Sequence, residues 1–240
     1  MLELKPERLG IADFSVQPVS ICGKQFAADA SGALYWPAER ALIVADLHLE
    51  KGSHFAQRGQ MLPPYDTRET LRRLAESIDR TGATAVIALG DSLHDKDATG
   101  RMAAEDRETL RIMQDACEWI WITGNHDPEI ASVLGGHVFE EITLEGITLR
   151  HEPRAGRVTH EIAGHLHPAA RLSLHGYSIR RPCFVGNGRR LVLPAFGTYA
   201  GGLNILDAAF EGLFGADGMA VWMLGQEGLY PVATRLLKED

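Results

Sequence analysis

The sequence predicts an α/β fold in which two β-sheets pack face to face and helices cover the outside. In the first half of the chain, short apolar runs alternate with stretches of helical periodicity, the rhythm of strands connected by helices. From about residue 138 onward, short strand-like segments follow one another directly. Because no linker separates the two halves, we expect residues 1–240 to form a single domain.

The first half opens with a predicted hairpin and continues with three buried strands. Apolar and polar residues alternate over residues 19–27, a turn is predicted at residues 29–32, and residues 33–36 complete the hairpin. Continuous apolar runs predict buried strands at residues 41–45, 84–89 and 119–122. A polar group follows each of these three runs, so the strand ends are candidates for a site.

Two helices are predicted between these strands. Asp66 is a typical N-cap with Glu69 three residues later, and Gly82 is a typical stop. Apolar residues at helical spacing between them predict a helix over residues 66–81. A second helix is predicted near residues 103–116, so both would lie outside the paired sheets.

The second half is predicted to consist mostly of strands. The segments that predict them are residues 142–144, 147–150, 161–163, 170–174, 178–184, 191–194, 220–224 and 229–233. A helical stretch is predicted near residues 206–214. This half would therefore complete the sandwich of two sheets.

Composition excludes several classes of protein. The chain of 240 residues is 45% apolar and 23% charged, which is typical of a folded globular protein, and its net charge of −8 argues against a general nucleic-acid coat. No run approaches 18 apolar residues and the first residues lack the pattern of a signal peptide, so we expect no membrane span. The widely spaced Cys22, Cys117 and Cys183 indicate reduced thiols in a cytoplasmic protein.

Positive charge is concentrated in one segment of this acidic chain. Residues 150–190 contain eight arginines and two glutamates, a net charge of +6. The arginines are Arg150, Arg154, Arg157, Arg171, Arg180, Arg181, Arg189 and Arg190. Two interpretations are open, because such residues either lie on solvated strand faces or form a local anion-binding surface.

Residue types that bind metals follow the predicted strands in order. They are Asp46 and His48, Asp91, Asn125, His151, and finally His165 and His167. Loops at the carboxyl ends of strands are where open α/β sheets build their sites. In an extended segment, residues i and i+2 point the same way, so each i, i+2 pair would aim two ligands at one pocket.

The ligand types indicate the class of metal. Carboxylates, imidazoles and one amide, without a thiolate, suit Mn²⁺, Fe or Zn²⁺. A carboxylate can bridge two cations, and Asp91 is the natural candidate. Each of these short motifs is a weak signal alone. Five of them in order at predicted strand ends, three of them after a glycine, are a specific signal for a metal site. The sequence therefore predicts a site for two divalent metal ions.

The ordered set, from Asp46 to His167, resembles the pattern D-x-H, G-D, G-N-H-[DE], H, G-H-x-H of the calcineurin-like metallophosphoesterase superfamily. The resemblance implies a four-layer α-β-β-α sandwich of two mixed sheets. It implies that one metal is held by Asp46, His48, Asp91 and His167, and the other by Asp91, Asn125, His151 and His165. It also implies that His126 is a catalytic histidine that faces the substrate without binding metal.

Such a centre would clamp a phosphodiester, activate water and stabilise the charge that develops during hydrolysis. His126 would hydrogen-bond a phosphate oxygen or protonate the leaving group. Asp127 would orient His126 or a ligand, or it would cap a helix beside Pro128.

Three further groups of residues are assigned by their place in the sequence. His94 would contact substrate or cover the metal loop, and Asp95 fits the acid that the superfamily tends to place there. The histidines without a motif partner, expected to be exposed or structural, are His54, His137, His160 and His175. The four tryptophans are expected in the core.

A narrower resemblance extends over nearly the whole chain. The stretches that carry it are residues 46–52, 58–67, 119–122, 149–153, 193–197 and 199–204. They are similar to the ligase-associated DNA damage response endonucleases, manganese-dependent phosphoesterases encoded beside a helicase and a DNA ligase. This resemblance implies Mn²⁺, a DNA substrate, a role in DNA repair, and association with a ligase and a helicase. Because a buried site requires the scissile phosphate to reach inward, we expect single-stranded or looped DNA rather than stiff duplex.

Other functions compete with that of a DNA endonuclease. A phosphodiesterase or phosphatase acting on a small or cyclic nucleotide would use the same metal core. A non-catalytic binding scaffold of this fold is disfavoured by the presence of His126 with a full ligand set. Cleavage of circular single-stranded DNA would separate the endonuclease from the small-substrate enzymes, because a small pocket does not admit a closed circle.

Overall fold

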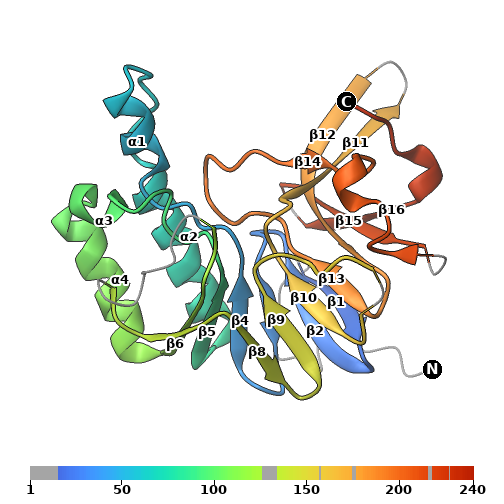
Figure 1. The fold of residues 1–240 in the computed structure, drawn as a ribbon, viewed down its shortest axis with the longest axis horizontal. Coiled ribbons are helices and arrows are strands. Elements are labelled where there is room, and N and C mark those ends of the chain that lie inside the picture. The colour runs from blue at the N-terminus through green and yellow to red at the C-terminus, as the bar shows by residue number, and fades with distance from the viewer. Residues whose placement is uncertain (1–15, 126–133, 157, 175–176, 216–217, 227) are drawn as a thin grey trace.

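The computed structural model describes residues 16–125, 134–156, 158–174, 177–215, 218–226 and 228–240. Its strands form two sheets that each mix parallel and antiparallel pairs, and α-helices lie on the outer side of the first sheet (Figure 1). The predicted α/β fold with two mixed sheets is therefore confirmed. No helix in the described ranges is long and apolar enough to cross a membrane.

The first sheet positions three of the predicted ligand loops. Its described strands, in spatial order, are β1 (Val16–Ile21), β2 (Lys24–Asp29), β3 (Leu34–Trp36), β4 (Ala41–Val44), β5 (Ala85–Leu89), β6 (Glu118–Ile122) and β7 (His137–Phe139). β1 to β4 pair antiparallel, whereas β4 to β7 pair parallel. The carboxyl ends of β4, β5 and β6 therefore meet at one edge of the sheet.

The opening hairpin differs from the prediction. The alternating stretch over residues 19–27 is not one strand, because Cys22 and Gly23 form a tight turn between β1 and β2. Both turn residues have left-handed φ values, 54° and 71°, as a two-residue hairpin turn of type I′ requires. The turn predicted at residues 29–32 is confirmed, because it connects β2 to the antiparallel strand β3. A Cys-Gly pair is a weak turn signal, and the alternation continues through it.

Four α-helices lie in the described part of the first half. They are α1 (Lys51–Gln57), α2 (Asp66–Thr81), α3 (Ala98–Arg101) and α4 (Ala104–Ala116). The predicted α2 and α4 are confirmed, and Gly82 ends α2 with a φ of 62°. Asp66 does not cap α2, however, because its Oδ2 accepts the Gly52 N–H at 2.9 Å and so ties α1 to α2. The apolar faces of α2 and α4 pack on the first sheet.

The second sheet is formed by the rest of the chain. Its described strands are β8 (Glu141–Leu144), β9 (Ile147–Arg150), β10 (Glu161–Ala163), β11 (Pro168–Leu174), β12 (Tyr177–Gly186), β13 (Arg190–Val192), β14 (Leu203–Asn204), β15 (Ala220–Leu224) and β16 (Leu229–Val232). They are arranged in the order β14-β11-β12-β13-β10-β9-β8, with β15 on β12 and β16 on β15. Since β9 and β10 run parallel, their carboxyl ends also lie together.

Three apolar clusters define the layers. The central cluster, which includes Phe26, Trp36 and Phe184, lies between the two sheets. The second lies under α2 and α4, and the third covers the outer face of the second sheet. The helix predicted near residues 206–214 is only a 3₁₀ turn (η2, Ala208–Phe210), and a second turn (η4, Thr234–Leu236) lies near the C-terminus. The outer layer over the second sheet is therefore built from 3₁₀ turns and loops whose apolar side chains, such as Phe210 and Leu213, pack on the strands.

Candidate metal centre

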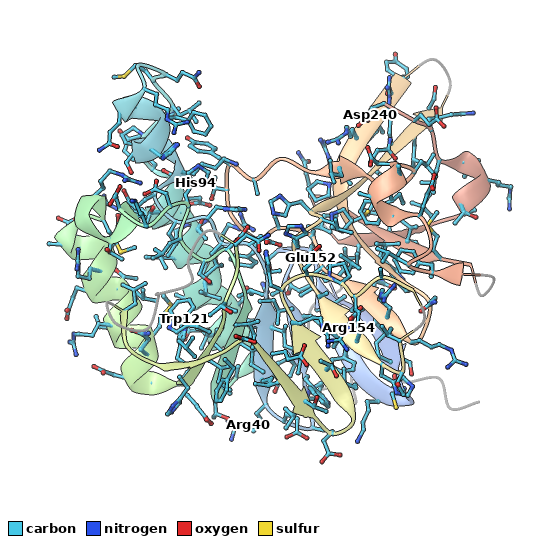
Figure 2. All side chains as sticks on the ribbon, in the orientation of Figure 1. Arg40, His94, Trp121, Glu152, Arg154 and Asp240 are labelled. Atoms are coloured by element: carbon cyan, nitrogen blue, oxygen red, sulfur yellow. The ribbon has the colours of Figure 1, made fainter. Side chains whose placement is uncertain are left out.

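The predicted ligands lie where the carboxyl ends of the parallel strands of both sheets meet. Asp46 follows β4 and Asp91 follows β5, while His151 follows β9 and His165 follows β10. Backbone hydrogen bonds hold these loops together, since the Asp46 N–H donates to Gly90 O at 3.2 Å and the Gly164 N–H donates to His151 O at 2.9 Å. Figure 2 labels His94 beside the helices and Glu152, the neighbour of His151, near the centre of the molecule.

Asp46, His48 and His167 form the first ligand group. One potential ligand atom of each lies within 4.8 Å of the others. Nε2 of His48 is 3.2 Å from Nε2 of His167, which is 3.4 Å from Oδ1 of Asp46. Ligands bound at about 2.0–2.2 Å around one ion are separated by such distances. The three residues come from loops 119 positions apart in sequence, so the fold brings them together as predicted.

Asp91, His151 and His165 form the second ligand group. Nδ1 of His165 is 3.0 Å from Nε2 of His151, which lies 3.5 Å from Oδ1 of Asp91. The two groups adjoin, because Oδ1 of Asp46 is 3.7 Å from Nδ1 of His151 and Oδ2 of Asp46 accepts the backbone N–H of His165 at 2.9 Å. Six of the seven predicted metal ligands therefore lie in two adjoining groups, with Asp91 in the second of them.

Backbone carbonyls orient two of the imidazoles. Nδ1 of His151 lies 3.0 Å from Leu89 O, and Nδ1 of His167 lies 3.1 Å from Gly201 O. A carbonyl can only accept, so each Nδ1 carries the proton and each Nε2 presents a lone pair toward its group. Metal-binding histidines are typically fixed in this way.

Five of the six grouped ligands have left-handed backbone conformations. The φ values are 54° for Asp46, 43° for His48, 44° for Asp91, 69° for His165 and 45° for His167. These conformations are unfavourable for residues with a Cβ, and such strain concentrates at functional sites. The prediction that these pairs lie on extended backbone is therefore wrong, and His165 and His167 belong to different groups.

The charges of the first group fit a bound cation. The Asp46 carboxylate is fully buried, and its Oδ1 accepts no hydrogen bond from the described part of the chain. Burial lowers the pKa of His167, but contact with the negative Asp46 carboxylate raises it more, so its pKa lies above the ordinary value. A buried carboxylate that favours positive charge on the neighbouring imidazole would also favour a divalent cation bound between the two side chains. Carboxylate and imidazole donors suit the predicted Mn²⁺, Fe or Zn²⁺.

Three other predicted site residues follow β6. Asn125 is exposed and comes directly after Gly124, where an added Cβ would lie 2.1 Å from the Asp91 backbone N. This contact places the Asn125 loop against the second ligand group. His126 and Asp127 lie outside the described residues.

His94 and Asp95 have different environments. The His94 ring lies edge-on to His48, with centroids 5.6 Å apart. Asp95 instead pairs with Arg101 at 2.6 Å and with His54 Nδ1 at 2.6 Å. Burial opposes ionisation of Asp95, but these hydrogen bonds and that of the Asp97 N–H lower its pKa to about 2. Asp95 therefore fixes α1 and α3 against the metal loop rather than contributing to either ligand group.

The sequence interpretation missed two residues of α1. His54, expected to be exposed or structural without a role at the site, packs on His94 with ring centroids 4.7 Å apart. Lys51 lies close enough to His167 for its charge to lower the pKa of that histidine. The helix is short and follows an αL residue, Glu50, so periodicity gave no signal for it.

Three described arginines of the arginine-rich segment are paired with acidic residues. Arg190 is fully buried and its Nε donates to Glu161 at 2.6 Å. Arg150 pairs with Glu141 at 2.7 Å, and Arg180 pairs with Asp240 at 2.9 Å on the β11–β12 hairpin. These described arginines are neutralised locally, which argues against the anion-binding interpretation for them.

We expect Gly90→Ala to damage the second ligand group. Gly90 has a φ of 73°, and an added Cβ would lie 2.3 Å from Nδ1 of His151, so the imidazole must move. Gly82→Ala is the matched control, because Gly82 is also left-handed at 62° but has nothing within 4 Å. Both variants should lose about 1–2 kcal/mol of stability from backbone strain, while only Gly90→Ala should lose metal. Elemental analysis beside thermal unfolding checks this, and equal metal content in both variants would contradict it.

The chain is similar to known proteins over much of its length. Residues 39–162 match the model of the calcineurin-like phosphoesterase family. A nuclease from Pseudomonas putida, called MPE, is 30% identical, with a TM-score of 0.69 over 90% of this chain and 100% of that one. The E. coli phosphoesterase Yfce is 16% identical, with a TM-score of 0.40 over 80% of this chain and 98% of that one. No curated protein matches.

Proposed function

The chain belongs to the calcineurin-like phosphoesterase family, and from this premise we propose that it is a manganese-dependent phosphodiesterase with two metal ions that cuts DNA internally. The adjoining ligand groups carry this proposal, because they offer six donors in two sets joined through Asp46. The similarity to the P. putida nuclease over the whole of that chain supports a nucleic acid as the substrate, and DNA is the nucleic acid that the narrower sequence resemblance implies. A role in DNA repair beside a ligase and a helicase remains a prediction.

Different residues of the chain would bind the metal ions, contact the substrate and orient the ligands. Asp46, His48 and His167 would hold one cation and Asp91, His151 and His165 the other, with Asn125 added to the second and Asp91 shared. When bound, two divalent cations supply charge stabilisation for phosphate oxygens and a nucleophile from water near neutral pH. His126 would hydrogen-bond a non-bridging oxygen or give its proton to the leaving alkoxide. The carbonyls of Leu89 and Gly201 keep two imidazoles in the metal-binding tautomer.

A nuclease assay with a panel of metals tests this proposal. Metal-free protein is given Mn²⁺, Mg²⁺, Zn²⁺ or no metal and assayed on circular single-stranded DNA, on a cyclic nucleotide and on bis-p-nitrophenyl phosphate. We expect Mn²⁺-dependent linearisation of the circle, because only internal cleavage opens it. Hydrolysis of the cyclic nucleotide with an intact circle would instead favour a small-substrate enzyme and overturn the proposal.

A further inference from the structure

The connection between α1 and α2 exposes apolar side chains next to the metal loops. Residues 56–65 are all exposed, including Met61 at 85%, Leu62 at 37% and Tyr65 at 64%. Figure 1 shows α1 and the turn after it projecting beyond the sheets. Single exposed apolar residues are ordinary, but three within five positions on one turn mark a contact surface. We name Met61, Leu62 and Tyr65 the apolar rim.

Hydrogen bonds connect the segment that carries the apolar rim to the rest of the fold. At its base, the Thr67 hydroxyl accepts the Glu50 N–H at 2.8 Å, and Asp66 accepts the Gly52 N–H at 2.9 Å. Pro63 and Pro64 fix the backbone near its tip. The Tyr199 hydroxyl donates to Pro63 O at 2.8 Å from across the site. A surface ordered in advance loses little entropy when it binds a ligand.

Two connections lead from the apolar rim to the ligand groups. On one side, the ring of Phe55 stacks on His94 with centroids 5.9 Å apart, and His94 packs against His48. On the other side, the loop that carries Tyr199 also supplies the Gly201 carbonyl to His167. After α1 (Lys51–Gln57) the chain turns back along the helix, because a Cβ on Gly52 would lie 3.4 Å from Pro63 O, so this part of the rim lies beside the start of α1, shortly after the first ligand loop.

The charge of this segment suits a nucleic acid. Residues 51–65 contain Lys51 and Arg58 but no Asp or Glu, in a chain with a net charge of −8. Neither cationic side chain makes an ion pair with the residues that the structure describes. Sequence-tolerant binding of single strands combines such cations with apolar and aromatic side chains on which bases stack.

From these contacts we propose that the apolar rim is a platform for unstacked bases of a single DNA strand whose backbone passes Lys51 and Arg58 into the metal centre. The proposal rests on the proposed DNA-cutting function and specifies the part of the substrate that is recognised. It predicts a preference for single strands, because paired bases have no exposed ring faces. Tyr65 and Met61 would be specificity-determining residues rather than catalytic ones.

The experiment compares two double variants. Met61→Ser/Tyr65→Ser removes the two most exposed side chains of the rim, and Ile112→Ser/Tyr230→Ser removes two exposed apolar side chains, 56% and 53%, from α4 and β16. Each is assayed with Mn²⁺ on a short single-stranded oligonucleotide, on an abasic strand of the same length and on bis-p-nitrophenyl phosphate. We expect the rim variant to lose about tenfold in kcat/KM on the normal oligonucleotide, mainly through KM. The rim variant should hydrolyse the abasic strand and the small diester at near wild-type rates. The control variant should hydrolyse all three substrates at near wild-type rates.

The outcomes separate the two proposals. If the wild-type protein cuts the oligonucleotide and the rim variant cuts it equally well, the base platform is overturned and the proposed DNA function stands. The surface would then be assigned to a protein partner. An equal loss on the abasic strand would also overturn it, because bases would not be what the rim contacts. Wild-type protein that hydrolyses the small diester but neither binds nor cuts the oligonucleotide would overturn the proposed DNA function, and the platform with it.

Discussion

Asp91→Ala is expected to reduce the rate of hydrolysis below about one-hundredth of the wild-type rate and to lower the metal content of the protein. Residues that only orient a metal ligand already cost 10–100-fold when they are removed, and Asp91 is proposed to touch both ions. Its carboxylate is buried, and Oδ1 lies 3.5 Å from Nε2 of His151. Without it, two cations would face each other with less negative charge between them.

Metal-dependent stability gives a measurement that does not require activity. Wild-type protein should gain thermal stability when Mn²⁺ is added, because binding to the folded state alone stabilises it, while Asp91→Ala should gain much less. Asp97→Ala, an exposed aspartate of the following loop, is the control and should respond like wild type. Two tightly held metals per chain in Asp91→Ala would contradict the bridging role.

Most of the fold could be predicted, because buried strands and amphipathic helices have direct periodic signals. The runs that became β4, β5 and β6 are continuous and apolar, and α2 has a clear apolar face and a glycine stop. The elements that were missed are short, namely α1, α3, β7 and β14. Their positions depend on contacts distant in sequence, such as the Gly52–Asp66 hydrogen bond, which no local pattern contains.

The candidate site could be predicted by residue type better than by geometry. The motifs identified six side chains that the structure brings together, because spacing after strands determines which loops meet. The backbone was predicted incorrectly, since alternation on an extended strand assumes negative φ, whereas Asp46 and His165 have φ values of 54° and 69°. The role of His54 could not be predicted, because its contacts with His94 and Asp95 come from 40 or more residues away.

His126 provides the test of catalysis as distinct from metal binding. It follows the proposed ligand Asn125 directly, within the G-N-H-[DE] pattern, and lies outside the described residues. A histidine has a pKa near neutrality, so it can donate a proton or a hydrogen bond at working pH. A catalytic histidine that is not a ligand should therefore be separable from the six grouped donors by experiment.

We expect His126→Ala to keep its fold and its metals while losing roughly 10²–10⁴-fold in turnover, the contribution typical of general acid–base groups. If His126 protonates the leaving alkoxide, the loss should be much smaller for a nitrophenyl diester, whose leaving group is stable without a proton, than for DNA. An equal loss on both substrates would exclude the role of a general acid and would leave stabilisation of the phosphate charge as the role of His126. His160→Ala is the control, since His160 lies after β9 without a motif partner and should retain full activity. Loss of bound metal from His126→Ala would contradict the assignment and make His126 a ligand, because a residue that only transfers protons does not hold the ions.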